Sequence, residues 1–502
     1  MFSKPVLVTG ATGYVGGRLI PLMLESGYRV RALARSLAKL RSRPWSGHIN
    51  IELVQGDVLD LASLNKAASG CGAAYYLVHS MVAQKRHYAE ADRKSALNMA
   101  AAAAAAGLER IIYLSGLGES HSTALSKHLQ SRHEVGVILQ SGTVPCTILR
   151  AAMILGSGSA SFEILRYLVE RLPVMITPNW VFTPCQPIAI RNVLNYLVGC
   201  LEHPETNGQI YDIGGPEVLN YRQIMDIYAK AAGLTKRWVI PVPFFTPSLS
   251  AYWIHLVTPV PSSIAVPLAQ GLSTPVVCKE NRIRTIVPQE LLSCRESIQL
   301  ALERLAQDRM DTCWMDAGPL LPPEWAYCGD AEYAGGTVMQ CGFRVVLKAS
   351  LDQVWAPISR IGGKNGWYYA SFLWQVRGLM DRLSGGVGLR RGRRSASRLY
   401  TGDALDFWRV LEIDAPHRLT LLAEMKTPGD AILEILLTPQ PNGLTLLQLL
   451  SRFMPKGLMG ILYWYLLYPF HEMIFSGMLR AIAKAVDQPI VSGPERFTLR
   501  IS

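Results

Sequence analysis

The sequence predicts two domains: an α/β domain with a doubly wound parallel sheet, followed by a smaller α+β domain. In the first part of the chain, short apolar segments alternate with helical patterns, which is typical of parallel strands covered on both faces. From about residue 340 to 450, apolar segments alternate with period two, as half-buried antiparallel strands do. A long apolar helical pattern over residues 457–486 follows. At 502 residues the chain is too long for one ordinary core, which agrees with this division.

The composition is that of a folded protein with scattered positive charge. Hydrophobic residues make up 49% of the chain, charged residues 18%, and the net charge is +12, which favours anionic ligands or a membrane surface as readily as nucleic acid. No basic module interleaved with aromatic residues is present, so no nucleic-acid partner is expected. The nine cysteines stand singly, so we expect no metal site and a reducing, cytoplasmic setting. No signal peptide is expected, because the first strand begins almost at once.

A glycine-rich turn joins the first strand, residues 6–8 (VLV), to the first helix, residues 18–26 (RLIPLMLES). Its glycines follow the spacing G-x-x-G-x-x-G, which in a dinucleotide site allows a sharp turn, close approach to a pyrophosphate and tight packing of helix on strand. A glycine-rich turn without function is the alternative, but the order strand, turn and helix favours a dinucleotide site. The residues predicted to hold the cofactor phosphates are Gly10, Thr12, Gly13, Tyr14, Val15 and Gly16.

The end of the second strand, residues 27–35, predicts which cofactor binds. An NAD site usually has an acidic residue about 20 positions after the glycine turn, where it binds the ribose 2′-hydroxyl. Here Arg35, followed by Ser36, occupies that place. A guanidinium pairs with the 2′-phosphate of NADP, so these residues predict NADP(H). A solvated charge at the strand end is the alternative.

Two further strand ends are expected to face the cofactor, because the carboxyl ends of parallel strands meet at one edge of the sheet. The strand over residues 51–58 ends in Asp57 and Val58, and a carboxylate followed by an apolar residue suits the adenine amino group. The strand over residues 74–80 brings His79 to the same edge.

Four motifs together resemble the atypical, NmrA-like short-chain dehydrogenases/reductases. They are residues 9–16 (TGATGYVG), 32–35 (ALAR), 56–58 (GDV) and 113–118 (YLSGLG). The resemblance covers about residues 3–310, and it implies a Rossmann fold that binds NADP(H).

The resemblance leaves the catalytic residues open. The classical family uses a serine and Tyr-x-x-x-Lys, in which the tyrosine protonates the carbonyl oxygen and the lysine lowers the tyrosine pKa. Ser115 matches the serine, but the helix over residues 125–135 (LSKHLQSRHEV) has no tyrosine. His128 and Arg132 keep the i,i+4 spacing, with Lys127 beside them, so His128 or Lys127 is the candidate acid and Arg132 the candidate ligand of ribose or phosphate. A charged helix face that binds without chemistry is the alternative.

Two segments are candidates for contact with a substrate. The Gly/Ser loop over residues 156–162 follows a sheet strand at the ligand-bearing edge, although an ordinary helix entry has the same composition. Residues 239–275 are rich in proline and aromatic residues, and their prolines exclude a long transmembrane span. This segment is either an apolar lid or a packing element between lobes.

The domain limits are expected at residues 1–318 and 341–502, with a linker over residues 319–340 where prolines and glycines replace periodicity. The second domain has the helix-grip order of a strand, a short helix, several strands and a long helix. It resembles the START-like (SRPBCC) domain of unknown function fused behind such reductases, which implies a cavity for a lipid, quinone or other apolar ligand. The motifs that carry this resemblance are residues 362–367 (GGKNGW), 385–394 (GGVGLRRGRR), 402–408 (GDALDFW) and 463–465 (YWY).

Two features of the second domain bear on a membrane. The run over residues 390–394 (RRGRR) suits phosphate, lipid headgroups or the cofactor of the first domain, although a solvated loop is commoner. Residues 458–470 (LMGILYWYLLYPF) are strongly apolar but fall short of the roughly 20 residues that a span needs. We expect a buried helix, with peripheral contact on the inner face of a membrane as an open alternative.

Together these patterns predict a cytoplasmic NADP(H)-binding reductase that transfers hydride to an apolar carbonyl, enone or quinone. One alternative is an NADP(H)-responsive binding protein without turnover, which the missing tyrosine favours. The other is a lipid or quinone carrier that keeps the cofactor as part of its structure. The identity of the substrate and the oligomeric state do not follow from the sequence.

Overall fold

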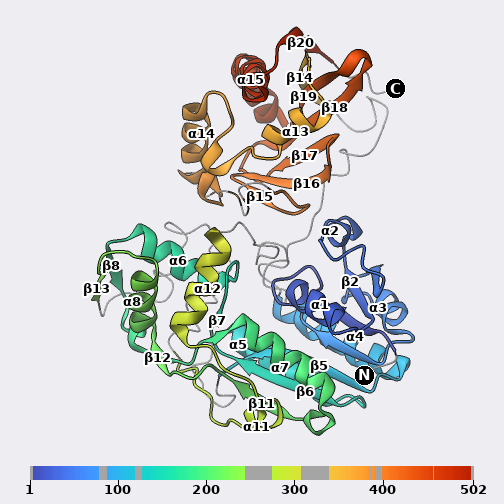
Figure 1. Ribbon diagram of the computed structural model, residues 1–502, viewed down its shortest axis with the longest axis vertical. Helices are drawn as coiled ribbons and strands as arrows, with labels where there is room; N and C mark the ends of the chain where they lie inside the picture. The colour runs from blue at the N-terminus through green and yellow to red at the C-terminus, as the bar shows by residue number, and fades with distance from the viewer. Residues whose placement is uncertain are drawn as a thin grey trace. The chain divides into compact units, whose positions relative to one another are not determined.

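The chain divides into two compact units, Met1–Pro319 and Leu320–Ser502, in the computed structural model shown in Figure 1. Each unit has its own sheet and its own buried core. The predicted linker lies almost wholly outside the described residues, as does most of the predicted lid. The structure describes residues 4–78, 88–118, 127–242, 274–306, 338–383, 386–391, 393, 395, 398–455 and 457–498.

The N-terminal unit is built on a seven-stranded parallel sheet in the order β3-β2-β1-β4-β5-β6-β11. This arrangement confirms the predicted doubly wound sheet. The strand order reverses between β1 and β4, and ligands of such sheets bind at this switch point, beyond the carboxyl ends of the strands. The strands are β1 (Val6–Thr9), β2 (Val30–Ala34), β3 (Ile51–Gln55), β4 (Ala73–Tyr76), β5 (Arg110–Gly116), β6 (Cys146–Ala151) and β11 (Ile210–Ile213).

Helices cover both faces of this sheet, because its strands carry apolar side chains on both sides. One core joins the sheet to α1 and α7, and the other joins it to α3, α4 and α5. The alanine-rich end of α4 lies close to the sheet, where Ala102 and Ala103 are fully buried. The helices are α1 (Gly16–Glu25), α2 (Leu37–Arg41), α3 (Leu61–Ala68), α4 (Tyr88–Ala106), α5 (Lys127–Gln140) and α7 (Ile190–Glu202).

A smaller lobe with its own core is formed by segments that follow β6. Its helices are α6 (Ala160–Arg171), α8 (Tyr221–Ala231) and α12 (Cys294–Ala306), whose apolar faces meet around Phe162 and Tyr228. Short elements complete it and connect it to the sheet: β7 (Ile154–Leu155), β8 (Val174–Thr177), β9 (Pro184–Cys185), β10 (Ile188–Ala189), β12 (Leu219–Asn220), β13 (Trp238–Pro241) and α11 (Ile283–Ile286).

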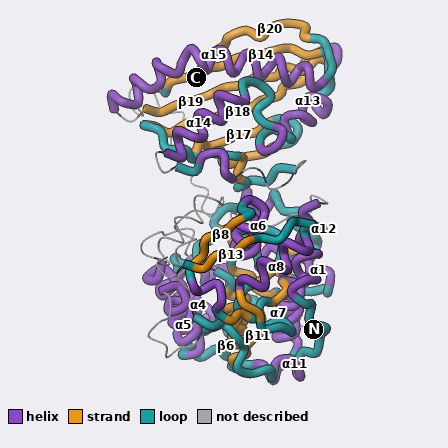
Figure 2. The backbone as a smooth tube through the Cα atoms, turned by 90° about the vertical axis from the view of Figure 1, so that its left-hand side faces the viewer, coloured by secondary structure: helices purple, strands orange, loops and turns teal. Residues whose placement is uncertain are grey.

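The C-terminal unit has a seven-stranded antiparallel sheet in the order β15-β16-β17-β18-β19-β14-β20, which Figure 2 shows with its helices. The predicted antiparallel α+β domain is therefore confirmed at this level. Its strands are β14 (Met339–Leu347), β15 (Ala404–Leu405), β16 (Trp408–Asp414), β17 (Arg418–Ala423), β18 (Gly429–Gln440), β19 (Leu444–Pro455) and β20 (Ile490–Phe497). Its helices are α13 (Leu351–Ile358), α14 (Ser371–Leu383) and α15 (Gly457–Val486).

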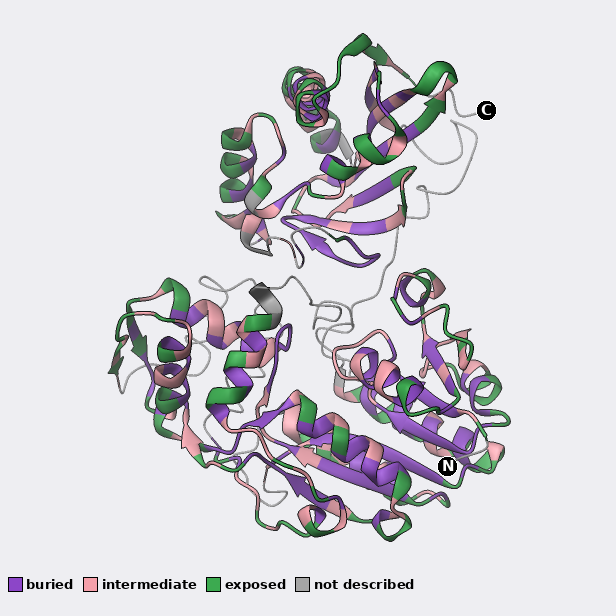
Figure 3. Ribbon diagram, in the orientation of Figure 1, coloured by how far each residue is buried: buried purple, intermediate pink, exposed green. Residues whose placement is uncertain are grey.

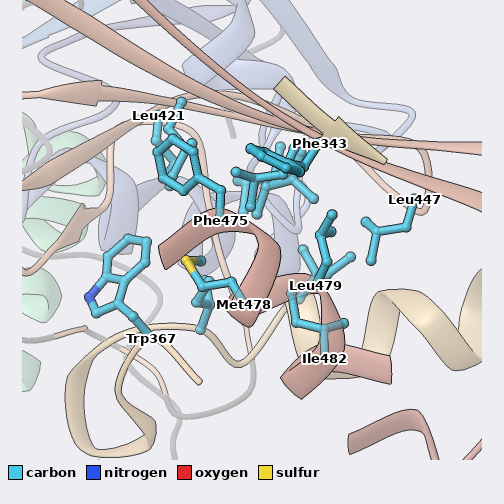
Figure 4. Close-up of a cluster of buried hydrophobic side chains, with 14 of the residues drawn as sticks. Phe343, Trp367, Leu421, Leu447, Phe475, Met478, Leu479 and Ile482 are labelled. Carbon is cyan, nitrogen blue, oxygen red and sulfur yellow. The ribbon is translucent and has the colours of Figure 1, made fainter. Parts of the chain in front are cut away.

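The core of this unit forms where the second half of α15 packs on the sheet. Figure 4 shows Phe343, Leu421 and Leu447 from three strands beside Phe475 and Met478 of the helix. In β17 and β19 alternate residues face this core, as the period-two pattern predicted. No described helix, α15 included, combines the length and apolarity that crossing a bilayer requires.

The predicted order of this unit lacks its last element. The long helix is followed by β20, which pairs antiparallel with β14. Between β15 and β16, Asp406 adopts a left-handed backbone (φ 54°) and turns the chain so that Leu405 pairs with Trp408. In the basic run, the guanidinium of Arg393 donates to the main-chain oxygens of Ser359 and Ile361 at 2.7 and 2.8 Å.

Candidate functional site

The glycine turn after β1 has the tight geometry that a dinucleotide site requires. Gly10 adopts φ +73°, and a Cβ placed there would lie 2.6 Å from the main-chain oxygen of Leu77. The amide of Gly13 donates to the oxygen of Gly10 at 2.9 Å, which closes the turn. A Cβ at Gly16 would clash with that same oxygen. Side chains are therefore excluded at Gly10 and Gly16, and a Cβ at Gly13 would lie a tight 3.1 Å from the oxygen of Gly10, so the backbone itself forms the surface.

The start of α1 presents main-chain amides at this surface. The residue that precedes the helix, Val15, makes no side-chain capping bond. At the neighbouring strand end, the hydroxyl of Thr9 donates to Tyr75 at 3.0 Å and accepts from the amide of Leu77 at 3.4 Å, which joins β1 to β4. A helix N-terminus held at the switch point of the sheet suits a pyrophosphate.

The residue predicted to select the cofactor lies directly after β2. Arg35 is exposed, and its main-chain oxygen accepts from the side chain of Gln55 at 3.2 Å. The hydroxyl of Ser36 accepts from the amide of Lys39 and caps the short helix α2. Arg31, which lies within β2, pairs instead with Glu52 at 2.7 Å. The structure thus places Arg35 just beyond the end of this strand, and its selection of the cofactor stays a prediction.

The end of β3 is organised by its own polar groups. The carboxylate of Asp57 accepts from the amide of Leu59 at 3.0 Å, and the oxygen of Val58 accepts from the side chain of Asn98 at 2.9 Å. Both residues are half-buried just beyond the strand. His79, predicted at the end of the next strand, lies outside the described residues.

Arg43 and Trp45 support the turn from behind, and the sequence patterns did not single them out. Nη2 of Arg43 donates to the main-chain oxygen of Thr12 at 3.3 Å, and Nε1 of Trp45 donates to that of Gly17 at the same distance. The arginine is 2% exposed. Its position after α2 resembles any basic helix end, so no local signal distinguishes it.

The Gly/Ser loop packs against the glycine turn. Nη2 of Arg18 donates to the main-chain oxygen of Ser157 at 2.7 Å, and its guanidinium lies 4.8 Å from the ring centre of Tyr14. A Cβ at Gly156 would clash with the hydroxyl of Tyr14. The hydroxyl of Ser159 caps α6 by accepting from Phe162. The loop therefore begins a helix, as one interpretation predicted, and it also borders the glycine turn. Its contact with a substrate stays a prediction.

Ser115 and Arg132 come together where β5 meets α5. The hydroxyl of Ser115 donates to the main-chain oxygen of Arg132 at 3.4 Å. Nη1 of Arg132 lies 3.4 Å from the main-chain oxygen of Leu114 and 3.5 Å from the hydroxyl of Tyr113, to which it donates. The arginine at the lysine position is thus bonded to the sheet.

A surface depression beside α5 includes Ser115, Arg132 and Arg150 in its lining. Ser115 pairs with Arg150 across β5 and β6, and Arg150 pairs with Asp212 across β6 and β11. Nη2 of Arg150 lies 2.6 Å from Oδ1 of Asp212, whose side chain is fully buried. A serine hydroxyl and two guanidinium groups therefore contribute to a hollow whose other lining residues are mostly apolar side chains and glycines.

The remaining candidates stand at the start of α5. His128 is half-buried, and its Nδ1 atom is shielded from solvent. It shares a helix face with Arg132 through the i,i+4 spacing. Lys127 is the first residue of the helix, and its side chain lies outside the described part of the structure.

The described cysteines of this unit do not supply a nucleophile. Burial raises the pKa of Cys146, Cys200, Cys278 and Cys294 to about 12, and that of Cys185 to about 11. These thiols stay protonated at neutral pH, whereas the thiolate is the reactive form. The candidate groups that the described residues bring to this site are therefore hydroxyl, imidazole and guanidinium groups.

The fold and the glycine turn are those of a Rossmann-like domain of the kind that binds NAD(P) at this turn. Residues 3–246 match the NmrA-like family, and residues 335–478 match a family described as a protein of unknown function, DUF2867. Both halves of the predicted domain pair are thus present, while the START-like character of the second rests on the sequence resemblance.

Several curated proteins are similar to parts of the chain. Cinnamoyl-CoA reductase 1 of Petunia hybrida is 29% identical over 22% of this chain and 35% of its own length. A (4-alkanoyl-5-oxo-2,5-dihydrofuran-3-yl)methyl phosphate reductase of Streptomyces griseus is 27% identical over 43% of this chain and 70% of its own length. A putative dihydroflavonol 4-reductase of Synechocystis sp. is 36% identical over 22% of this chain and 32% of its own length. The chain thus spans about a third of two of these relatives.

Among solved structures, the triphenylmethane reductase of Citrobacter sp. complexed with NADP(H) is 18% identical, with 59% of this chain and 99% of that chain covered, at a TM-score of 0.49. An Escherichia coli NADPH-dependent quinone oxidoreductase complexed with NADPH is 19% identical, with 58% and 98% covered, at a TM-score of 0.48.

Proposed function

We propose that the N-terminal unit binds NADP(H) and that the protein is a reductase for an apolar carbonyl, enone or quinone. The observation that carries the proposal is the side-chain-free turn of Gly10, Gly13 and Gly16 at the switch point of the sheet, with Arg35 where an NAD site has an acid. The reductase names of the relatives support the same reaction class.

The residues of the turn fit a dinucleotide. Amides of the turn and of the start of α1 would bind the pyrophosphate, and the exposed guanidinium of Arg35 would pair with a 2′-phosphate. When bound, NADPH supplies the hydride. The hydroxyl of Ser115 would then orient the substrate carbonyl. The imidazole of His128 would donate a proton to the carbonyl oxygen, in place of the absent tyrosine.

A second candidate function is favoured by the contacts of Arg132. Because its guanidinium is bonded to Leu114 and Tyr113, the residue at the lysine position serves the joint between helix and sheet. A protein of this kind would bind NADP(H) and change its contacts with a partner or ligand without turnover. The two functions share the cofactor and differ in chemistry.

Calorimetric titration with NADPH and NADH tests the cofactor. We expect tighter binding of NADPH, and we expect Arg35→Asp to weaken it by roughly tenfold or more, because charge-assisted hydrogen bonds contribute about 1.5–3 kcal/mol. Arg29→Asp is the matched control, since Arg29 is exposed and precedes the opposite end of the same strand. Equal NADPH affinity in the two variants would show that Arg35 does not select the cofactor.

Oxidation of NADPH against a panel of quinones, aldehydes and enones separates the two functions. Turnover that depends on one substrate class supports the reductase. Tight binding of NADPH with no turnover across the panel would favour the binding protein.

A further inference from the structure

The C-terminal unit exposes a large apolar surface on two neighbouring helices. On α14, Phe372 and Leu383 are 71% and 81% exposed, and on α15, Leu466 is 71% exposed. Figure 3 shows that exposed residues cover much of α14. We name this surface the helix-pair face, and define it by the exposed residues Phe372, Val376, Leu379, Met380, Leu383, Met459, Leu462, Tyr465, Leu466, Phe470 and Met473.

These side chains recur at helical spacing on the outer side of each helix. Phe372, Val376, Leu379 and Leu383 follow one another at intervals of three and four residues, while Trp374 on the opposite side of α14 is buried. On α15 the buried Trp464 likewise lies opposite the exposed residues. Each helix is therefore apolar both toward the core and away from it.

The second half of α15 shows that the core does not require this outward apolar surface. Beyond Met473 the helix still buries an apolar side, with Phe475 and Leu479 in the core. Its outward positions there are charged, because Arg480 and Lys484 are exposed. One continuous helix thus changes from an apolar outer face to a basic one.

Contacts join α14 and the segment before it to α15. The guanidinium of Arg377, in the middle of α14, lies 5.2 Å from the ring centre of Tyr463 on α15. Before the start of α14, the ring of Tyr369 fills the space beside Gly477 of α15. The two apolar faces therefore belong to neighbouring helices of the same unit.

The charge around this surface is positive. The one acid of α14, Asp381, is buried and accepts from the amides of Gly388 and Lys426, both at 2.7 Å. The one acid of α15, Glu472, is paired with Arg496 at 3.1 Å. The basic residues of α14 are Arg377 and Arg382.

We propose that the helix-pair face docks on the surface of an anionic lipid bilayer. Contiguous apolar surfaces of this kind mark interaction sites. Helices that lie in the interface place apolar side chains among the acyl chains, with basic residues beside the phosphates. Each of the two helices has a single acid, one buried and one paired with Arg496, which matches an anionic surface. The apolar run over 458–470 is too short to span the bilayer. This inference is independent of the proposed cofactor and reaction.

Co-sedimentation of the full chain with lipid vesicles tests the proposal. Vesicles of phosphatidylglycerol mixed with phosphatidylcholine are compared with vesicles of phosphatidylcholine alone, at low and high salt. We expect binding to the anionic vesicles that weakens at high salt, because exposed charges are screened. The double variant Leu462→Glu/Leu466→Glu should reduce the bound fraction by about tenfold or more, since it places two charges among acyl chains.

The matched control is Ile49→Glu/Val491→Glu, which makes the same change at two exposed apolar positions outside the face. It should bind vesicles like the unaltered protein, and the far-UV circular dichroism of both variants should show that they fold. If the protein binds neutral vesicles equally well, or if salt does not weaken its binding, the proposed preference for an anionic bilayer is wrong.

Failure to bind any vesicle would overturn the proposal altogether. Sedimentation velocity then identifies the occupant: a dimer that Leu462→Glu/Leu466→Glu converts to a monomer assigns the face to a second copy of this chain. A monomer that binds no vesicle shows that the helix-pair face binds neither a bilayer nor a second copy of this chain.

Discussion

Nη2 of Arg43 donates a hydrogen bond to the main-chain oxygen of Thr12 over 3.3 Å, from a side chain that is 2% exposed. The bond ties the chain after α2 to the glycine turn before α1. A buried guanidinium that is bonded in this way holds the turn in one conformation, and a preorganised turn is what allows the backbone to meet a pyrophosphate at little further cost.

Replacement of Arg43 should therefore weaken cofactor binding by loosening the glycine turn, although the side chain acts only through the turn. Arg43→Met keeps most of the side-chain length but removes the donors, and we expect NADPH affinity to fall about tenfold, since a hydrogen bond of a charged group contributes about 1.5–3 kcal/mol. Titration calorimetry measures it. Arg41→Met, an exposed arginine two residues earlier, is the control. If both variants bind NADPH alike, the turn does not depend on Arg43.

A methyl group at Gly16 should disrupt the turn directly. The added Cβ of Gly16→Ala would clash with the main-chain oxygen of Gly10, and overpacking costs about 1–3 kcal/mol. We expect NADPH affinity to fall roughly tenfold or more. Gly47→Ala serves as the control, because a Cβ at Gly47 meets no atom within 4 Å. Unchanged affinity in Gly16→Ala would mean that the cofactor phosphates bind elsewhere.

The proposed acid can be tested once a substrate class supports turnover. A general acid contributes roughly 10²–10⁴ to the rate, so His128→Asn should lower kcat by about a hundredfold and leave the Kd for NADPH unchanged. The control is His48→Asn, at an exposed histidine of the same unit. Full turnover in His128→Asn would remove this residue from the mechanism and leave Lys127 as the remaining sequence candidate.

The sequence predicted the parts of the site that depend on local geometry. Glycine spacing after a strand is a local signal, because the turn, the strand and the helix are neighbours along the chain. Arg35 was predicted for the same reason, since it ends the next strand. Arg43 was missed because its contact with Thr12 depends on how the chain returns after α2, which no periodicity encodes.

In the C-terminal unit, the strands that face the core were predicted and the edge strand was not. Leu419 and Leu421 of β17 alternate with the polar Thr420, because the two leucines face the core beneath α15. Most residues of β20 are exposed, so the strand carries no alternating apolar pattern. The sequence after the long helix therefore gives no signal for a further strand. The helix α14 and its exposed apolar residues were not predicted either.

His471 should make the stability of the C-terminal unit depend on pH. Burial, and secondarily the charge of Arg377, lower the pKa of its imidazole from 6.5 to about 4. Its shielded Nδ1 has no hydrogen-bond partner among the described residues. Because the unfolded chain takes up a proton near pH 6.5 and the folded chain does so only near 4, stability is present above pH 6.5 and is lost as the pH falls through this window.

The loss should be on the order of 3 kcal/mol, since each pKa unit corresponds to about 1.4 kcal/mol. His471→Phe removes the titrating group and keeps an aromatic ring, which stacks on Phe475 with ring centres 5.4 Å apart. Urea unfolding followed by tryptophan fluorescence at pH 7 and pH 4 should show a smaller decline in the variant than in the unaltered protein. His417→Phe, at an exposed histidine of the same unit, should keep the full decline. An equal decline in all three proteins would mean that the pKa of His471 is the same in the folded and unfolded protein. Water or a ligand would then reach its ring.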